Sequence, residues 1–311
     1  MNILVTGSTG FLGNAIVGRL KNKGNTVLGI ERDVHRKINL PHKPDVSVRG
    51  DIRDYNFVRR VIVDYEIEEI YHCAAQAVVR SCANDPYTTF DINIMGTISI
   101  LEACRNSGDT VKSVVISTSD KAFGHAPPPY TEKTSLSPLY TYETSKACQQ
   151  MVSLCYFHNY GVPVKIVASS NVYGPGDPNM SRIIPNTITR LASEKPALLN
   201  EGVANYIREF VYIDDVVGAF VCVARKGKPG EVYCCGGTEH LPIKDLMKKI
   251  CVLMGKDHQL DVKIFQKSRY YKEIENQWID STKLQGLGWK PFIYLDEGLK
   301  RSIDYYSKTE V

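Results

Sequence analysis

The first twenty residues constrain the fold of this chain more than any other stretch. An apolar run at residues 3–5 leads into the glycine-rich segment TGSTGFLG at residues 6–13. An amphipathic segment follows from Asn14 to Leu20. A strand, a glycine turn and a helix in this order predict a βα unit whose helix N-terminus points free N–H groups at a bound phosphate.

Three glycines give this turn its predicted role. They stand at Gly7, Gly10 and Gly13, in the spacing GxxGxxG rather than the better-known GxGxxG. We expect Gly7 to allow a tight turn, Gly10 to let the backbone approach a pyrophosphate, and Gly13 to let the helix lie close to the sheet. The predicted dinucleotide site therefore comprises the glycines and the residues between them, namely Gly7, Thr9, Gly10, Phe11, Leu12 and Gly13.

Composition limits the classes of protein to consider. The 311 residues suffice for one large core or two domains, and 43% hydrophobic with 23% charged residues is typical of globular proteins. The formal charge of +4 is too small to predict nucleic-acid binding. Apolar runs are too short for a membrane span, and residues 1–20 lack a signal-peptide pattern. Nine cysteines without a CxxC pair predict neither disulfides nor a metal site, so we expect a cytoplasmic protein.

Strands and helices are predicted to alternate through residue 170. This pattern predicts an α/β fold, a Rossmann-type doubly wound parallel sheet. The predicted strands are 25–30, 46–48, 69–73, 111–117 and 164–169, and the predicted helices are 54–65, 87–107 and 141–160. We expect residues 1–170, with about 208–226, to form the NAD-binding domain.

The second half of the chain is less regular. It contains predicted strands at 197–199 and 208–214 and predicted helices at 181–193, 215–225, 241–254 and 295–306. We expect residues 171–311 to form a smaller, mixed lobe that binds the substrate over the cleft.

Residues that follow the predicted strands complete the cofactor site. Glu31 ends the second strand about 20 positions past the glycine loop, where an acidic residue binds the ribose hydroxyls. Its charge would repel a 2′-phosphate and favours NAD over NADP, whereas the neighbouring Arg32 could accept that phosphate. The other residues expected at the cofactor are Asp51, Ile52, Ala74, Ala75, Gln76, Asn93 and Ser117.

Ser119, Tyr142 and Lys146 are the predicted centre of the chemistry. Ser119 follows a buried strand at the carboxyl edge of the sheet, and Tyr142 and Lys146 lie one helical turn apart. A lysine ammonium at this spacing favours phenolate and should lower the pKa of Tyr142. With Ser119 holding the reacting oxygen, Tyr142 could take a proton from a secondary alcohol as hydride leaves for nicotinamide.

Six segments together resemble one family. TGSTGFLG, HCAAQ, NIMGT, YETSK, NVYGPGD and REFVYIDDV, in this order, are similar to the extended short-chain dehydrogenase/reductase family of nucleotide-sugar enzymes. The resemblance extends from Met1 to about Trp289 and implies tightly bound NAD, a nucleotide-diphosphate sugar as substrate, and a homodimer formed through the helices that carry Gly96 and Tyr142. One departure is Ala168, where many relatives carry an arginine.

The resemblance also implies a set of substrate contacts. Arg208, with Arg182 in SRIIP, is expected to hold the diphosphate, because a guanidinium can contact phosphate oxygens in a bidentate manner. Gln76, Ser119 and Asn171 are the other residues expected to contact substrate.

Asp120 and Lys121 distinguish possible reactions within the family. TSDKAFG resembles the Thr-Asp-Lys segment of CDP-glucose 4,6-dehydratases, and VVRS, SRIIP and EIENQWID strengthen this likeness. Once carbon 4 of the sugar is a ketone, Lys121 could remove the acidic hydrogen on carbon 5, and a protonated Asp120 could protonate the departing 6-hydroxyl. The simpler interpretation is a capping aspartate and a surface lysine in a loop.

The sequence therefore predicts an NAD-dependent nucleotide-sugar 4,6-dehydratase that yields a 4-keto-6-deoxy sugar. A nucleotide-sugar 4-epimerase is the first alternative, since it needs only Ser119, Tyr142 and Lys146. A non-catalytic NAD-binding regulator is the second, and the intact set of these three residues argues against it. No metal is expected.

Overall fold

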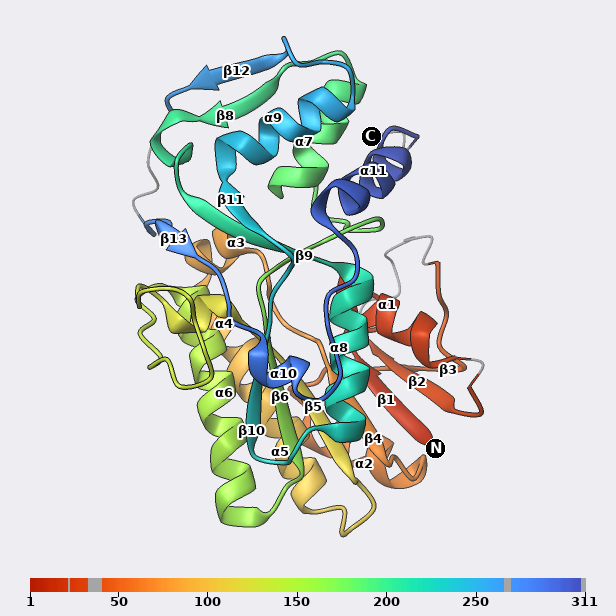
Figure 1. The fold of residues 1–311 in the computed structure, drawn as a ribbon. Coiled ribbons are helices and arrows are strands. Elements are labelled where there is room, and N and C mark those ends of the chain that lie inside the picture. The colour runs from red at the N-terminus through yellow and green to blue at the C-terminus, as the bar shows by residue number, and fades with distance from the viewer. Residues whose placement is uncertain (22, 33–40, 266–269, 309–311) are drawn as a thin grey trace.

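A seven-stranded parallel sheet forms the larger part of the molecule (Figure 1). The computed structural model describes residues 1–21, 23–32, 41–265 and 270–308. The strand order is β10-β6-β5-β4-β1-β2-β3, and every neighbouring pair is parallel. The strands are β1 (Asn2–Thr6), β2 (Thr26–Glu31), β3 (Val46–Arg49), β4 (Glu69–His72), β5 (Ser113–Ser119), β6 (Val164–Ser169) and β10 (Glu231–Cys235).

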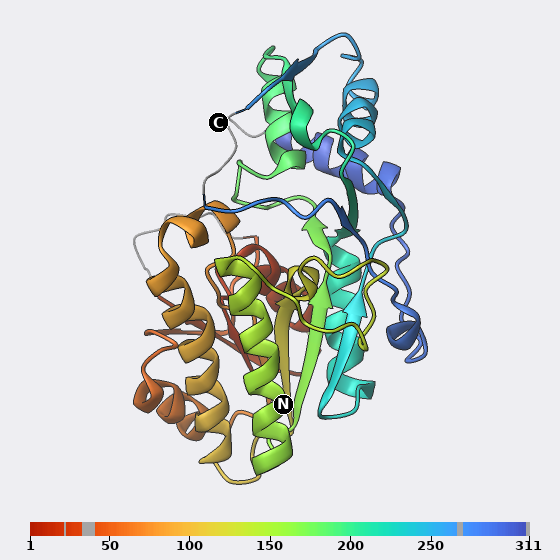
Figure 2. The ribbon, with the colours of Figure 1, turned by 90° about the vertical axis from the view of Figure 1, so that its left-hand side faces the viewer.

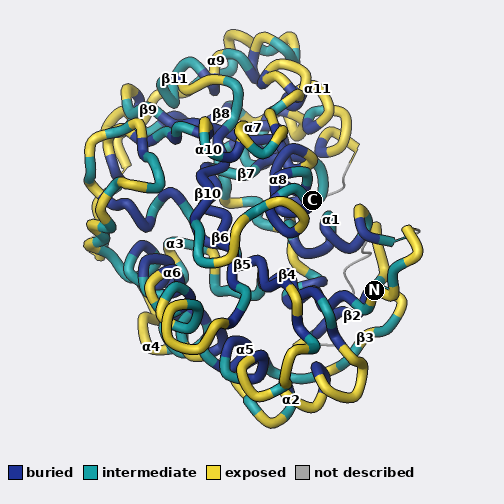
Figure 3. The backbone as a smooth tube through the Cα atoms, turned by 60° about the horizontal axis from the view of Figure 1, so that its bottom comes forward, coloured by how far each residue is buried: buried dark blue, intermediate teal, exposed yellow. Residues whose placement is uncertain are grey.

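Helices cover both faces of this sheet, as Figure 2 shows. The helices α1 (Phe11–Leu20) and α8 (Ile213–Lys226) pack on one face, and α2 (Tyr55–Asp64), α5 (Gly96–Arg105) and α6 (Thr141–Tyr160) pack on the other. The strands bury side chains on both faces because of this arrangement, as their uninterrupted apolar sequences require. Figure 3 shows this buried layer in dark blue along the strands. The predicted doubly wound α/β fold is confirmed.

A smaller lobe lies beyond the carboxyl edge of the sheet (Figure 1). Its strand β9 (Ile207–Tyr212) pairs with β7 (Asn171–Tyr173), β11 (His240–Pro242) and β13 (Asn276–Gln277). A separate pair is formed by β8 (Ala197–Asn200) and β12 (Leu260–Lys263). The helices of the lobe are α7 (Ile183–Ala192), α9 (Ile243–Leu253) and α11 (Leu295–Tyr306), while the short α10 (Thr282–Gln285) packs beside β10.

The chain crosses between the two parts more often than the sequence predicted. Strand β10 lies in the seven-stranded sheet beside β6, although the predicted boundary at residue 170 assigned it to the lobe. Of residues 208–226, only α8 packs on the large sheet, whereas β9 belongs to the lobe. The pattern of β10 is as apolar as that of the other buried strands, so local sequence cannot say which sheet it joins.

The helix predicted over 87–107 is interrupted. It consists of α4 (Pro86–Phe90), a π-helical turn at Asp91–Met95 and α5, and is preceded by an unpredicted short helix α3 (Val79–Asn84). A π-helical turn adds a residue to the helix and is frequent at functional sites. Here Asn93 lies within the π-helical turn and is completely buried.

The helix that carries Tyr142 and Lys146 has the predicted bounds, Thr141–Tyr160. At its start, Glu143 Oε2 accepts hydrogen bonds from the backbone N–H groups of Leu139 and Tyr140, at 3.0 and 3.3 Å. These bonds satisfy N–H groups that a helix N-terminus otherwise leaves unpaired. At its end, Gly161 adopts the left-handed conformation with φ 70° that commonly terminates helices.

The glycine loop depends on close backbone contact. Gly10 N–H donates to Gly7 O at 2.8 Å, and Gly7 has φ +68°. A Cβ atom on Gly13 would lie 2.2 Å from Gly7 O, so only glycine allows α1 to start this close to β1.

We expect Gly13→Ala to lower the free energy of unfolding by about 1–3 kcal/mol, because the added methyl forces α1 away from the turn. Urea denaturation would measure this change. Gly202→Ala is the matched control, since its nearest atom would be 3.5 Å away, and it should alter stability by less than about 0.5 kcal/mol. Equal effects of the two substitutions would contradict the contact.

Candidate active site

The strands β1 and β4 are neighbours in space, but their chain connections run to opposite sides of the sheet. A crevice at the carboxyl edge is expected at such a switch point, and ligands bind there in open α/β folds. Here Gly7 lies against Ala74, with a hypothetical Gly7 Cβ only 2.9 Å from Ala74 Cα. The residue before α1 is Gly10, which has no side chain that could cap the helix. The first N–H groups of α1 are therefore not used by such a cap and can bind a group at this edge.

Glu31 lies at the end of β2, as predicted. Its Oε1 accepts a hydrogen bond from Ser47 Oγ at 2.8 Å, and its carbonyl accepts one from Gly50 N–H. These contacts fix Glu31 at the same edge as the glycine loop. Arg32 follows directly, and its positive charge contributes to lowering the pKa of Asp51.

Asp51 is part of an ion-pair network that the sequence did not predict. Arg53 donates to Asp51 at 2.7 and 3.0 Å and to Asp91 at 2.5 Å. The hydrogen bonds from Arg53 hold the pKa of Asp51 below its usual value despite partial burial. The next residue, Ile52, is buried against Gly96 of α5. This apolar contact also attaches the β3–α2 loop to α5.

Asn93 positions the site and does not present a free side chain. Its Oδ1 accepts from Gln76 N–H at 2.7 Å, and its Nδ2 donates to Gln76 O at 3.0 Å and to Ser145 Oγ at 2.9 Å. Ser145 lies on α6 beside Lys146. The amide therefore fixes the segment Ala74–Gln76 relative to the predicted catalytic helix.

A buried polar chain behind the site also escaped the sequence analysis. His72 Nδ1 lies 2.8 Å from Thr6 Oγ1, and His72 Nε2 lies 3.0 Å from Thr97 Oγ1, which accepts a hydrogen bond from Gln149 Nε2 at 2.7 Å. Burial lowers the pKa of His72 to about 3, so the imidazole is neutral. The motif HCAAQ contained this histidine, but only the fold shows what it contacts.

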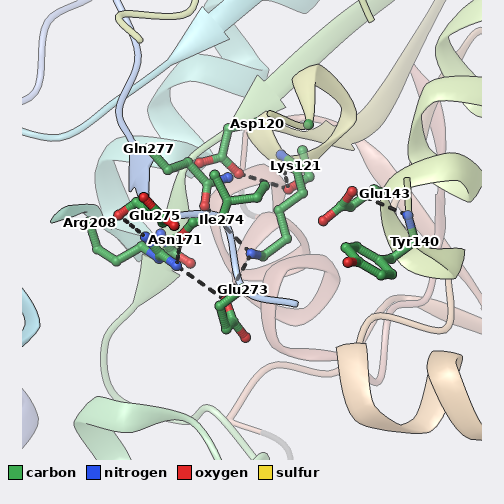
Figure 4. Close-up of polar contacts among 12 residues, drawn as sticks. Asp120, Lys121, Tyr140, Glu143, Asn171, Arg208, Glu273, Ile274, Glu275 and Gln277 are labelled. Atoms are coloured by element: carbon green, nitrogen blue, oxygen red, sulfur yellow. Dashed lines mark hydrogen bonds and ion pairs between the residues drawn. The ribbon is translucent and has the colours of Figure 1, made fainter. Parts of the chain in front are cut away.

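Ser119, Asp120 and Lys121 occupy one turn at the end of β5. Figure 4 shows Asp120 and Lys121 there. Ser119 Oγ donates to Asp120 Oδ1 at 3.0 Å and accepts from Lys121 N–H at 3.2 Å. Asp120 is 2% exposed, and burial raises its pKa to about 6 against the opposing pull of Lys121 and Ser119. The side chain of Lys121 is only 14% exposed, so the interpretation of this pair as a capping aspartate and a surface lysine does not hold.

Tyr142 and Lys146 lie on the side of α6 that faces β5. Lys146 Nζ donates to Ser117 O at 3.0 Å and lies 6.0 Å from the centre of the Tyr142 ring. The Ser119 hydroxyl lies close enough to Tyr142 to act on the pKa of its phenol, which it lowers. The three residues predicted to act together are therefore brought together by β5 and α6.

The expectation that the pKa of Tyr142 is lowered is wrong for the protein without bound ligands. Burial raises this pKa to about 12, and it outweighs the opposing effects of Arg182 and Ser119. Burial also lowers the pKa of Lys146 to about 8. Both shifts have one cause, the cost of placing a charge in a poorly solvated site.

The two arginines predicted to bind a diphosphate differ in their surroundings. Arg182 starts α7, is partly exposed, and is paired with the buried Asp177 at 2.9 Å. Arg208 is 5% exposed and donates to the carbonyls of Ile207, Ile274 and Glu275 as well as to Glu273. Arg208 thus already holds the segment 273–275, which the sequence analysis assigned no role.

The remaining predicted substrate contact, Asn171, lies on β7 and donates to Glu209 O at 2.9 Å. Behind Arg182, the hydroxyl of Tyr306 on α11 donates to Gly174 O and accepts from Asp177 N–H, at 2.9 and 3.0 Å. The C-terminal helix therefore fixes the loop that carries Arg182, a contact that no local motif indicates.

The GDP-mannose 4,6-dehydratase family model matches residues 4–302. The chain belongs to this family. It is 30% identical over 319 residues to a trifunctional enzyme of Arabidopsis thaliana, UDP-glucose 4,6-dehydratase/UDP-4-keto-6-deoxy-D-glucose 3,5-epimerase/UDP-4-keto-L-rhamnose-reductase. That match covers 99% of the chain but only 47% of the relative, so the chain spans about half the length of this protein.

Two solved structures are similar to this chain over nearly its whole length. The UDP-glucose 4-epimerase of Thermotoga maritima with UDP-glucose has a TM-score of 0.91 at 28% identity, covering 99% of both chains. The dTDP-glucose 4,6-dehydratase of Bacillus anthracis in complex with NAD has a TM-score of 0.88 at 25% identity, covering 100% of this chain and 97% of the other. The predicted membership of the family of NAD-dependent epimerases and dehydratases is confirmed.

Two further expectations concern a membrane span and a metal site. Within the described ranges, no helix is both long and apolar enough to cross a membrane. Among the same residues, no group of three or more histidine, cysteine or acidic side chains is arranged to hold a metal ion.

We expect Tyr142→Phe to leave folding intact and to reduce turnover by about 100- to 10,000-fold, the usual cost of losing a positioned acid or base. Steady-state kinetics with a nucleotide sugar and a thermal melt of the same sample would test both parts. Near-normal turnover would exclude the proton-transfer role of Tyr142.

Lys146→Met should inactivate the enzyme yet stabilise it at pH 7, by up to about 3 kcal/mol, because a buried ammonium is removed. Between about pH 8 and 10.4 the unfolded chain binds more protons at Lys146 than the folded one, so wild-type stability rises with pH. The advantage of the variant should therefore shrink across this window. Urea denaturation at pH 7, 9 and 10 would measure it, with the exposed Lys300→Met as control. An advantage that grows with pH would contradict the assignment.

Proposed function

We propose that this protein is an NAD-dependent 4,6-dehydratase of a nucleoside-diphosphate sugar. It converts the sugar to its 4-keto-6-deoxy form with no net consumption of NAD. Residues 1–170 with α8 and β10 bind the cofactor, and the lobe binds the nucleotide sugar. The nine cysteines are all free, which fits the reducing cytoplasm as its location.

The buried carboxyl group of Asp120 carries this proposal. Its pKa of about 6 leaves about a tenth of the group protonated at pH 7, far more than for an ordinary aspartate, and a general acid must be protonated. Its Oδ2 is buried and has no hydrogen-bond partner in the described part of the chain. An unpaired buried carboxyl oxygen is costly unless a substrate group completes it. Oxidation and reduction at carbon 4 alone would not need this acid.

In the proposed reaction, each of three residues transfers a proton at a different atom of the sugar. Tyr142, beside Ser119, takes the proton of the 4-hydroxyl as carbon 4 becomes a ketone. Lys121 then takes the proton from carbon 5 as a neutral amine, and Asp120 gives its proton to the 6-hydroxyl, which leaves as water. In the last step, Lys121 returns a proton to carbon 5.

The glycine loop and the adjoining strand ends fit NAD. We propose that the N-terminus of α1 holds the pyrophosphate, that Glu31 binds the adenosine ribose, and that Lys146 binds the nicotinamide ribose. When bound, NAD would provide the hydride acceptor for carbon 4 and the source of the hydride returned to carbon 6. Cβ atoms at Gly7 and Gly13 would collide with Ala74 and with Gly7 O, so these two glycines allow the tight turn on which the proposed pyrophosphate site depends.

A nucleotide-sugar 4-epimerase is the second candidate. The high similarity to the Thermotoga maritima epimerase favours it, since the two chains superpose over 99% of their lengths. The resemblance of TSDKAFG to dehydratases and the environment of Asp120 favour the dehydratase.

We further propose a homodimer through the helices that carry Gly96 and Tyr142. Exposed apolar side chains lie along these helices and the turns before them, at Tyr87, Met95, Met151 and Tyr160. Burial of such a surface is a common reason for association.

We expect the wild-type protein to convert a nucleotide sugar into a product lighter by one water molecule and, in deuterated water, to place deuterium at carbon 5. Asp120→Asn and Lys121→Met should abolish this product, because each removes one proton-transfer group needed for elimination. Mass spectrometry of a panel of nucleotide sugars would measure both effects.

Lys133→Met, at an exposed position in the following loop, is the control and should behave as wild type. If wild-type protein returned only a sugar of unchanged mass without deuterium at carbon 5, the epimerase would be the correct function.

A further inference from the structure

Glu273 lies between two cations that the proposed function requires (Figure 4). Its Oε2 is 3.2 Å from Arg208 Nη2 and 3.8 Å from Lys121 Nζ. Burial acts against ionisation of Glu273, but the charges of Lys121 and Arg208 hold its pKa below the usual value. A single carboxylate oxygen therefore neutralises both the predicted base and a predicted diphosphate ligand.

The other contacts of Arg208 are of a different kind. Three backbone carbonyls, of Ile207, Ile274 and Glu275, accept hydrogen bonds from its guanidinium. Through the carbonyls of Ile274 and Glu275, Arg208 holds the backbone of the segment 273–275 in place. Glu273 supplies the only charged contact among the described partners of Arg208, and its side chain is 36% exposed where that of Arg208 is 7% exposed.

We propose that Glu273 is a positioning residue that occupies the place of the substrate diphosphate at Arg208 and is displaced by it. This inference rests on the proposed function, in which Arg208 binds the diphosphate of a nucleotide sugar. Only the Glu273 side chain needs to rotate toward solvent, because the carbonyl contacts hold the backbone of the segment. A diphosphate carries more negative charge than a carboxylate and offers more acceptor oxygens to a guanidinium, so it should win this exchange.

The exchange has a consequence for Lys121. The same oxygen of Glu273 faces both cations, so its departure from Arg208 also removes this carboxylate from Lys121. Because the diphosphate takes its place at Arg208, an anion stays near Lys121 after the exchange. Gln277 Oε1, at 3.5 Å from Lys121 Nζ, is a neutral acceptor that the exchange leaves in place.

Glu273→Gln tests the proposal without turnover. Isothermal titration of the holoenzyme with UDP, dTDP, CDP and GDP should show the best ligand binding about 3- to 30-fold tighter than to wild type, because a competing charge-assisted contact is gone. The corresponding nucleoside, which lacks phosphate, should bind equally to both. Glu275→Gln is the matched control: it makes the same charge change two residues away, at a side chain 59% exposed and paired with Lys272. Its effect should stay within about twofold.

Kinetics and a conservative variant separate this role from others. With the nucleotide-sugar substrate, Glu273→Gln should lower KM while kcat stays within about twofold, since Glu273 has already left Arg208 in the substrate complex. Glu273→Asp keeps the charge and should restore wild-type affinity. Weaker or unchanged nucleoside-diphosphate binding by Glu273→Gln, or a fall in kcat at unchanged KM, would overturn the proposal. Because the titration needs no reaction, it gives its answer even if the products show that the dehydratase assignment is wrong.

Discussion

All seven strands of the large sheet run in one direction, and the site depends on this constraint. Parallel strands bring their carboxyl ends to one edge, so residues that follow β1, β2, β4, β5 and β6 meet there although they are far apart in the chain. The glycine loop, Glu31, the segment Ala74–Gln76 and the turn Ser119–Lys121 share this edge for that reason. The helices supply the remaining groups, because α6 crosses the end of β5 with Tyr142 and Lys146 directed toward it.

Burial then determines the protonation of the groups at this edge. It raises the pKa of Asp120 and of Tyr142 and lowers that of Lys146, in each case because the charged form is poorly solvated. The shifts of Asp120 and Lys146 bring both groups toward neutral pH. Tyr142 is shifted away from it, so the proton transfer that we propose for this residue depends on the charges that surround it in the complete complex.

The segment 270–277 joins the two parts of the molecule at the site. It crosses from the lobe, pairs with β9 at Asn276–Gln277, and places Glu273 and Gln277 beside Lys121. Arg208 fixes this segment through carbonyl groups, which leaves the carboxylate contact as the one that a substrate can replace. One side chain of this segment therefore contacts both the arginine proposed to bind the substrate in the lobe and the proposed base on the sheet.

The sequence by itself determined the βα units, the glycine turn and the spacing of Tyr142 and Lys146, because short-range patterns and helical periodicity control these features. It therefore predicted the fold class, the family and the helix at residues 141–160. Only the tertiary structure decided that β10 joins the large sheet, that Asn93 supports Gln76, and that Glu273 faces Lys121. Those contacts join residues far apart in the chain, and the burial that shifts each pKa arises only when the sheet, the helices and the lobe pack together.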